Sequence, residues 1–142
     1  MKAFLDTSSL FKLYHEERES EIVLGVLSNG VTEIFLAETA ILEFRSAVWK
    51  KVREKQIDES VGMQIVSYFQ ADYENYQWIR LQPDIINMAS NLLMKYGRNG
   101  LRTLDSLQLA SALSLKDNNE CVFLTSDDLL RSLFKKEDLR TV

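Results

Sequence analysis

Residues 2–15 read KAFLDTSSLFKLYH, and this stretch decides the fold. Its start, residues 2–5, has the character of a buried strand, and residues 8–15 have the spacing of a helix. Asp6 stands where the strand gives way to the helix. In an open α/β fold, the carboxyl ends of the strands and the helix starts beside them share one crevice. The stretch therefore predicts an α/β fold with a carboxylate in that crevice.

Strand and helix patterns alternate through the rest of the chain. Further strands are expected at residues 31–38, 78–81 and 121–125, with an edge strand at 139–142. Helices are expected at residues 20–28, 38–55, 58–76, 83–97 and 128–134, and a further helix is expected to be capped by Thr103. The helices at 38–55 and 58–76 are expected to form an antiparallel hairpin. Such alternation implies a parallel sheet covered by helices on both sides.

Three more acids occupy settings like that of Asp6. Asp127 follows the strand in VFLTSDDLL, while Glu43 in AILEFRSAV and Asp105 in LRTLDSLQLASAL lie in amphipathic helices. Carboxylates that converge repel one another and raise each other's pKa unless a cation joins them. We therefore expect the four acids to bind a divalent metal ion.

Each acid also has a purely structural interpretation. Asp6 and Asp127 are at positions where an aspartate caps a helix, and Asp105 lies in a first helical turn, where the helix dipole favours a negative charge. Glu43 has small neighbours, among them Ser46 and Ala47, that leave an opening beside its carboxylate, and its alternative interpretation is an ordinary solvated glutamate.

The acid pair after the last buried strand leaves a choice. We assign the metal-binding role to Asp127, which is nearer the strand, and expect Asp128 to help cap the following helix. Three hydroxyl side chains, Ser8, Thr125 and Ser126, are candidates to orient the carboxylates or a metal-bound water, and helix capping is their alternative role.

The sequence excludes several other chemistries. With one histidine, His15, and one cysteine, Cys121, it has no zinc cluster of the usual ligand set. Residues 97–100 read GRNG and lack the pattern of a phosphate-binding P-loop. Cys121 is expected to be a reduced thiol packed in a strand. The remaining option is an oxygen-only acidic site, which suits Mg²⁺ or Mn²⁺.

Length and charge set further limits. A chain of 142 residues is expected to fold as one domain, residues 1–142. Its net charge of −4 opposes binding of nucleic acid by bulk electrostatics, but a bound divalent ion would make the acidic pocket attract phosphate. No run approaches the length of a membrane span and no signal peptide is evident, so we expect no membrane association and a cytoplasmic location.

Four segments in this order resemble the PIN-domain family of metal-dependent nucleases, most closely the toxin ribonucleases of VapBC-type toxin–antitoxin pairs. They are DTSSLFKLYHEE, LAETAILEFRSAVWKK, GLRTLDSLQLASAL and FLTSDDLL. The resemblance implies a single PIN-like domain with a three-layer α/β/α fold around a mainly parallel sheet. It implies Asp6, Asp105 and Asp127 as ligands of Mg²⁺ or Mn²⁺, with Glu43 acting directly or through water, and hydrolysis of RNA that leaves a 5′-phosphate.

The resemblance also implies a homodimer and a cognate antitoxin that occupies the groove and supplies a basic side chain to the acidic pocket. Apolar contacts with that partner are expected near Leu10, Phe11 and Trp49, for which packing in the core is the alternative.

Two other functions compete with the nuclease. One is a PIN fold kept as a catalytically silent protein-interaction scaffold, against which the intact set of four acids argues. The other is a phospho-accepting receiver or an aspartyl-phosphate phosphatase. The phosphatase needs an acid two residues after Asp6, where this chain has Ser8. The receiver needs an acidic pair before its first helix, and this chain has none there.

Overall fold

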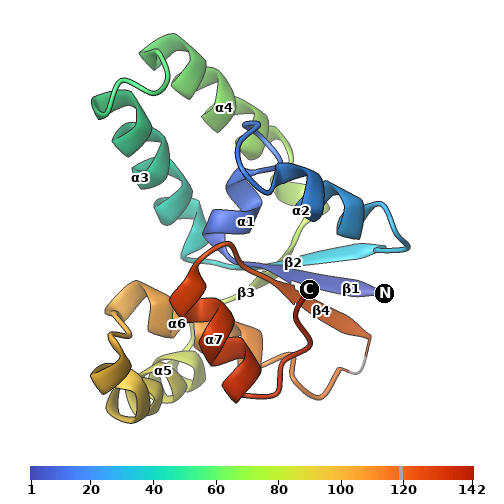
Figure 1. The fold of residues 1–142 in the computed structure, drawn as a ribbon, viewed down its shortest axis with the longest axis vertical. Coiled ribbons are helices and arrows are strands. Elements are labelled where there is room, and N and C mark those ends of the chain that lie inside the picture. Colours follow the sequence, from blue (N-terminus) through green and yellow to red (C-terminus); the bar gives the residue numbers. More distant parts are fainter. Residues whose placement is uncertain (119) are drawn as a thin grey trace.

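The computed structural model describes residues 1–118 and 120–142, in which a parallel sheet lies between two layers of helices (Figure 1). The strands, in the spatial order β3-β2-β1-β4, are β1 (Lys2–Leu5), β2 (Glu33–Ala37), β3 (Gln77–Ile79) and β4 (Cys121–Leu124). The helices are α1 (Thr7–Phe11), α2 (Ser20–Leu27), α3 (Ala40–Arg53), α4 (Glu59–Ala71), α5 (Pro83–Tyr96), α6 (Thr103–Leu113) and α7 (Asp128–Lys136). The predicted three-layer α/β/α fold is confirmed.

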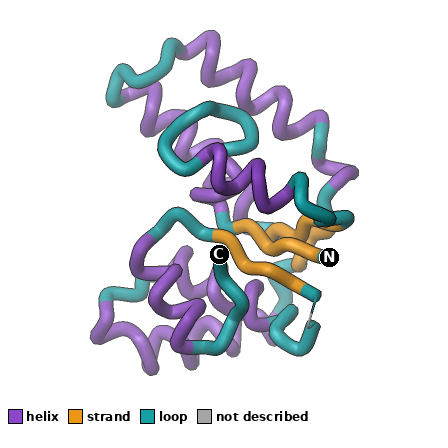
Figure 2. The backbone as a smooth tube through the Cα atoms, turned by 45° about the vertical axis from the view of Figure 1, so that its right-hand side comes forward, coloured by secondary structure: helices purple, strands orange, loops and turns teal. Residues whose placement is uncertain are grey.

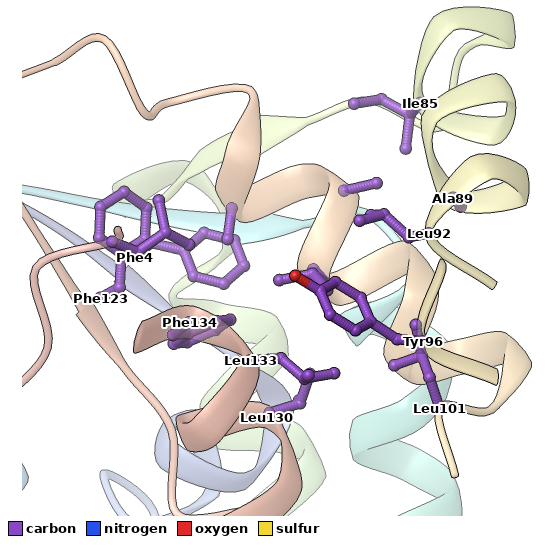
Figure 3. Close-up of a cluster of buried hydrophobic side chains, with 14 of the residues drawn as sticks. Phe4, Ile85, Ala89, Leu92, Tyr96, Leu101, Phe123, Leu130, Leu133 and Phe134 are labelled. Atoms are coloured by element: carbon purple, nitrogen blue, oxygen red, sulfur yellow. The ribbon is translucent and has the colours of Figure 1, made fainter. Parts of the chain in front are cut away.

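The central strand β1 has side chains in both cores of the protein. Phe4 packs in a cluster formed with α5, α6 and α7, which Figure 3 shows in close-up. Ala3 and Leu5 point to the opposite face and pack in the cluster formed with α1 to α4. This alternation is the period of two that a strand imposes, and it explains why a strand buried on both faces is apolar throughout. Figure 2 shows the two helical layers on either side of the strands.

The register between β1 and β4 places the ends of these two strands side by side. Leu5 pairs with Leu124, and the backbone N–H of Asp6 donates to the carbonyl of Leu124 at 3.2 Å. Because the strands are parallel, the loops that leave their carboxyl ends lie at the same edge of the sheet. The predicted packed thiol is also found, because Cys121 in β4 is a free, buried cysteine.

Helices α3 and α4 form the predicted antiparallel hairpin and extend away from the sheet (Figure 1). Their close approach depends on Gly62, where a Cβ atom would lie 3.0 Å from Cγ1 of Val48. At its base the hairpin is filled by aromatic rings, with the ring of Phe44 4.2 Å from that of Phe69 and 5.1 Å from that of Phe11, measured between centroids. The aromatic cluster fixes α3, and with it Glu43, against α1.

Several predicted element ends are wrong. Helix α1 ends at Phe11 instead of residue 15, because the chain tightens into turns that pack Tyr14 against Phe44 at a centroid distance of 5.5 Å. Helix α4 ends at Ala71 instead of residue 76, and a 3₁₀ turn then brings Tyr76 into the core.

Two further predictions about ends need correction. Thr103 does not cap α6: it is the first residue of the helix, and the capping position is occupied by Arg102, whose side chain makes no capping hydrogen bond. At residues 139–142, an isolated parallel bridge from Thr141 to Phe123 takes the place of the expected edge strand. In the described residues, no helix has both the length and the apolar character needed to cross a membrane.

Replacing Phe44 by alanine tests the aromatic cluster. The ring is fully buried, so Phe44→Ala is expected to lower the free energy of unfolding by about 3–5 kcal/mol. Leu42→Ala on the same helix is the matched control, because Leu42 is 72% exposed and its loss is expected to change stability by less than about 0.5 kcal/mol. Urea unfolding measures both values, and equal losses would contradict the assignment of the cluster to the core.

Candidate active site

Asp6 is held in a fixed position at the end of β1. Its carboxylate accepts hydrogen bonds from the backbone N–H of Ser9 at 2.9 Å and from Oγ1 of Thr125 at 2.6 Å. The hydroxyl of Ser8 lies 2.7 Å and 2.9 Å from the two carboxylate oxygens. Asp6 is only 3% exposed, and burial raises its pKa, with a smaller contribution from the charge of Asp127, although the hydrogen bonds oppose the rise. The capping role considered for Asp6 is thus real, and its second oxygen is engaged by Thr125.

Thr125 links Asp6 to Asp127. While its hydroxyl donates to Asp6, its oxygen accepts from the backbone N–H of Asp127 at 3.0 Å. A second link joins the same two loops, because the N–H of Ser126 donates to the hydroxyl of Ser8 at 2.9 Å. The predicted orienting role is therefore supported for the hydroxyls of Ser8 and Thr125, whereas Ser126 takes part through its backbone N–H; these contacts couple the carboxyl ends of β1 and β4.

The structure corrects the expected roles of the adjacent acids Asp127 and Asp128. Asp127, and not Asp128, caps α7, with one carboxylate oxygen accepting from the N–H of Leu130 at 2.7 Å. Asp128 is 98% exposed and pairs with Arg131 at 3.1 Å. A capping residue at a strand end directs its side chain back over the first turn of the helix. This orientation keeps the Asp127 carboxylate next to Thr125 and Asp6. Asp127 is solvent-exposed and retains one oxygen outside the cap.

Glu43 and the loop after β1 share one side-chain partner. Nε2 of Gln108 donates to the Glu43 carboxylate at 2.8 Å and to Oγ1 of Thr7 at 3.1 Å. Sequence reasoning missed Gln108, although its position three residues after Asp105 puts the two on one face of α6 and was an available signal. Gln108 is 2% exposed, and in the described part of the chain its carbonyl oxygen has no hydrogen-bond partner. This leaves a buried acceptor next to Glu43.

A groove of about 480 Å³ runs past Glu43. Ser46 and Ala47 are among its lining residues, as are Ser8 and Ser126 from the coupled loops. The opening that small neighbours were expected to leave beside Glu43 is therefore present, and the groove connects it to the carboxyl ends of β1 and β4.

The four acids act on one another electrostatically. Burial, followed by the charges of Asp6 and Asp105, raises the pKa of the half-buried Glu43. Burial, followed by the charge of Asp127, raises the pKa of Asp105 in the first turn of α6. Every one of the four carboxylates is thus coupled to at least one other, although they come from four separate segments of the chain.

As they are arranged in residues 1–118 and 120–142, no three His, Cys, Asp or Glu side chains stand close enough together to enclose a metal ion. Carboxylates without a counter-ion repel one another, so their charges favour an arrangement in which the carboxyl groups stand apart. The available ligand atoms fit a hard divalent cation, because they are carboxylate oxygens together with the amide oxygen of Gln108, which has no hydrogen-bond partner among the described residues. His15 packs edge-to-face against Phe11, with the ring centroids 6.0 Å apart.

Comparison with known proteins agrees with this fold. A family model described as the PIN domain matches residues 3–135. No curated protein sequence matches the chain. Among solved structures, the VapBC2 complex of Rickettsia felis bound to a DNA fragment from its promoter is similar with a TM-score of 0.66 and 14% identity, over 100% of this chain and 98% of that one.

Two further structures have the same architecture. The toxin VapC20 of Mycobacterium tuberculosis, described as cleaving the sarcin–ricin loop, has a TM-score of 0.68 and 10% identity over 92% of this chain and 94% of that one. VapBC-1 of Haemophilus influenzae has a TM-score of 0.65 and 14% identity over 100% and 97%, respectively. At this identity the likeness concerns the fold. Since the family match covers nearly the whole sequence and the fold agrees with it, the chain belongs to the PIN domain family.

Proposed function

We propose that this PIN domain is a metal-dependent endoribonuclease that hydrolyses RNA phosphodiesters and serves as the toxin of a toxin–antitoxin pair. The observation that carries the proposal is the rigidly held, buried carboxylate of Asp6, which is electrostatically coupled to Asp127 and Glu43, while Asp105 is coupled to those two acids. Membership of the PIN family and the similar fold of a toxin described as cleaving the sarcin–ricin loop support it.

Asp6, Asp105 and Asp127 would hold Mg²⁺ or Mn²⁺, with Glu43 acting directly or through water. When bound, such an ion would activate water and neutralise charge on a phosphoryl group. The protein contributes preorganisation, because Ser8, Ser9 and Thr125 fix Asp6 before any ligand arrives.

Gln108 has a positioning role in this proposal. Its amide N–H groups hold the Glu43 carboxylate and the Thr7 hydroxyl at set positions, so α3, α6 and the loop after β1 keep their relative placement at the groove. In this proposal the RNA chain approaches Glu43 from solvent through the groove of about 480 Å³ that this residue lines.

The partners in this proposal are an RNA substrate, a second copy of the chain and an antitoxin protein, all in the cytoplasm. The similar solved structures include one described as a toxin–antitoxin complex from Klebsiella pneumoniae. Of the apolar contacts expected with the antitoxin, Leu10 and Phe11 are buried at 0% and 3% exposure and belong to the core. Trp49 is 42% exposed and stays available for a partner.

The first test removes the Asp6 charge. Asp6→Asn is expected to lower RNA cleavage in Mg²⁺ or Mn²⁺ by at least about 100-fold, because a metal ligand is lost. Asp128→Asn is the matched control, since it makes the same charge change at an exposed neighbour that lies outside the coupled loops. Cleavage of total RNA by the purified proteins measures both effects. Wild-type activity in Asp6→Asn would refute the assignment, and full activity in Asp127→Asn together with loss in Asp128→Asn would exchange the two acids.

The second test concerns stability and pH in the metal-free protein. The folded-state pKa of Asp6 is raised, so above its ordinary value of 3.8 the folded state binds more protons than the unfolded state, and stability from this group falls as pH rises. Asp6→Asn is therefore expected to gain stability relative to wild type between about pH 4 and 7, by about 1.4 kcal/mol for each unit of pKa difference. Urea unfolding in EDTA measures the gain. A stability difference independent of pH would show that the pKa of Asp6 is not raised in the folded protein.

The third test concerns toxicity. Expression of the wild-type chain in bacteria is expected to arrest growth, because unregulated RNA cleavage damages the cell, whereas Asp6→Asn is expected to be harmless. Co-expression of a small protein encoded next to this chain is expected to restore growth and to co-purify with it. Harmless wild-type expression without any bound neighbour product would favour the catalytically silent scaffold.

A further inference from the structure

Basic side chains line the groove beside Glu43. Lys12, which follows α1, and Lys51, in the last turn of α3, both line the groove. Their ammonium groups bind the same carboxylate, with Nζ of Lys12 2.9 Å from one oxygen of Glu17 and Nζ of Lys51 2.9 Å from the other. We name these three residues the lysine bridge. It contains two positive charges and one negative charge, so it leaves one positive charge facing the groove.

The lysine bridge is more enclosed than an ordinary surface ion pair. The Lys12 side chain is only 8% exposed, and those of Lys51 and Glu17 are 23% and 25% exposed. A buried ammonium group keeps its charge only with a partner, which Glu17 supplies. Burial raises the pKa of Glu17, but hydrogen bonds from Lys12 and Lys51 outweigh it and lower the pKa below its ordinary value, so the carboxylate stays charged. The Lys51 ammonium group also lies 5.2 Å from the centre of the Phe11 ring, which restricts its position.

Lys12 borders a second hollow as well as the groove. This hollow, of about 210 Å³, is lined by Lys12, Arg18 and Ser126, together with Glu19 and Asp128. In the described part of the chain, Glu17 is the one hydrogen-bond acceptor of the Lys12 ammonium group, which leaves two of its three N–H groups for a ligand. Lys12 therefore lies between two openings that meet at Ser126, next to the coupled loops.

We infer that the lysine bridge binds the phosphate next to the scissile phosphate of a single-stranded RNA, with Lys12 and Lys51 as the contacting residues and Glu17 as the residue that positions them. The inference rests on the proposed ribonuclease function. One uncompensated positive charge matches the single negative charge of a phosphodiester. The chain carries a net charge of −4, so bulk electrostatics oppose RNA binding and a local basic contact is needed to keep RNA in the groove.

The chemistry of the groove favours RNA over a protein as the ligand of the lysine bridge. The groove is lined by Glu43, Ser126 and Lys12, and the second hollow shares Ser126 and Lys12 with it, so together they suit a chain that presents a phosphate at regular intervals. Exposed Lys50 lines the same groove and adds positive charge without a fixed geometry. The contacts are to phosphate alone, so the bridge is expected to add affinity without base preference.

The test measures binding of a short fluorescein-labelled single-stranded RNA of mixed sequence by the uncleaving Asp6→Asn protein at constant Mg²⁺. Adding Lys12→Met or Lys51→Met is expected to weaken binding about fivefold and to lower the slope of log affinity against log salt by about 0.7, the value for one lost phosphate contact on a single strand. Methionine keeps the apolar stem, so packing is preserved. Lys136→Met, at the exposed end of α7, makes the same charge change and is expected to change neither quantity.

Glu17→Gln separates a binding role from a structural one. It breaks the bridge but keeps both lysines, so RNA affinity is expected to hold or rise, while kcat in the otherwise wild-type protein falls because the lysines lose their fixed positions. If the bridge only stabilises the fold, all three variants instead lower the melting temperature and change RNA binding in the same direction. That result would overturn the inference.

The remaining outcomes separate the inference from the proposed function. An Asp6→Asn parent that binds no RNA, or lysine variants that match the Lys136→Met control, overturn the inference even if the wild-type protein cleaves RNA. Lysine variants that bind RNA normally but lose a protein partner assign the bridge to that partner and also overturn it. Lysine-dependent binding in a protein that never cleaves RNA would support the bridge and refute the nuclease.

Discussion

The hydrogen bond from Thr125 to the buried carboxylate of Asp6 is the interaction on which the arrangement of the site depends. It joins the carboxyl ends of β1 and β4, two strands separated by more than a hundred residues of sequence. The parallel register of Leu5 with Leu124 brings the two loops together, and the second hydrogen bond of Thr125 extends the connection to Asp127. A carboxylate that accepts several hydrogen bonds has no freedom to rotate, so Asp6 is oriented by the fold before a ligand binds.

This arrangement places stability and the proposed chemistry in opposition. Burial and mutual repulsion raise the pKa values of Asp6, Glu43 and Asp105, which means that their ionised forms are disfavoured in the folded protein without a counter-ion. This unfavourable contribution to the stability of the fold is offset by the two clusters of buried apolar side chains on either face of β1, which involve every layer of the fold. Sites that carry such strain are those where a cation or a cationic partner gains most by binding, because it relieves the repulsion.

Acids with different partners line the same groove. In the part of the chain that the structure describes, Glu43 forms no ion pair, whereas Glu17 is bound by both Lys12 and Lys51. The same type of side chain therefore has opposite roles, and its neighbours decide which: burial among acids raises the pKa of Glu43, and the two ammonium groups lower that of Glu17. A net charge of −4 for the whole chain conceals this difference, which is why overall charge is a poor guide to what the groove binds.

The sequence by itself determined the α/β class, the parallel sheet and the helical hairpin, because apolar periodicity is a local pattern, and it singled out the four acids as candidate metal ligands. It could not determine that α1 ends at Phe11 or that Asp127 instead of Asp128 caps α7, because packing of Tyr14 and the turn of a single side chain decide these points. Gln108 and the lysine bridge also escaped sequence reasoning. Gln108 meets Glu43 across 65 positions, and Lys12 meets Lys51 only through Glu17. Such contacts exist only after the sheet and the helical layers have brought distant segments together, and therefore only the tertiary structure decided them.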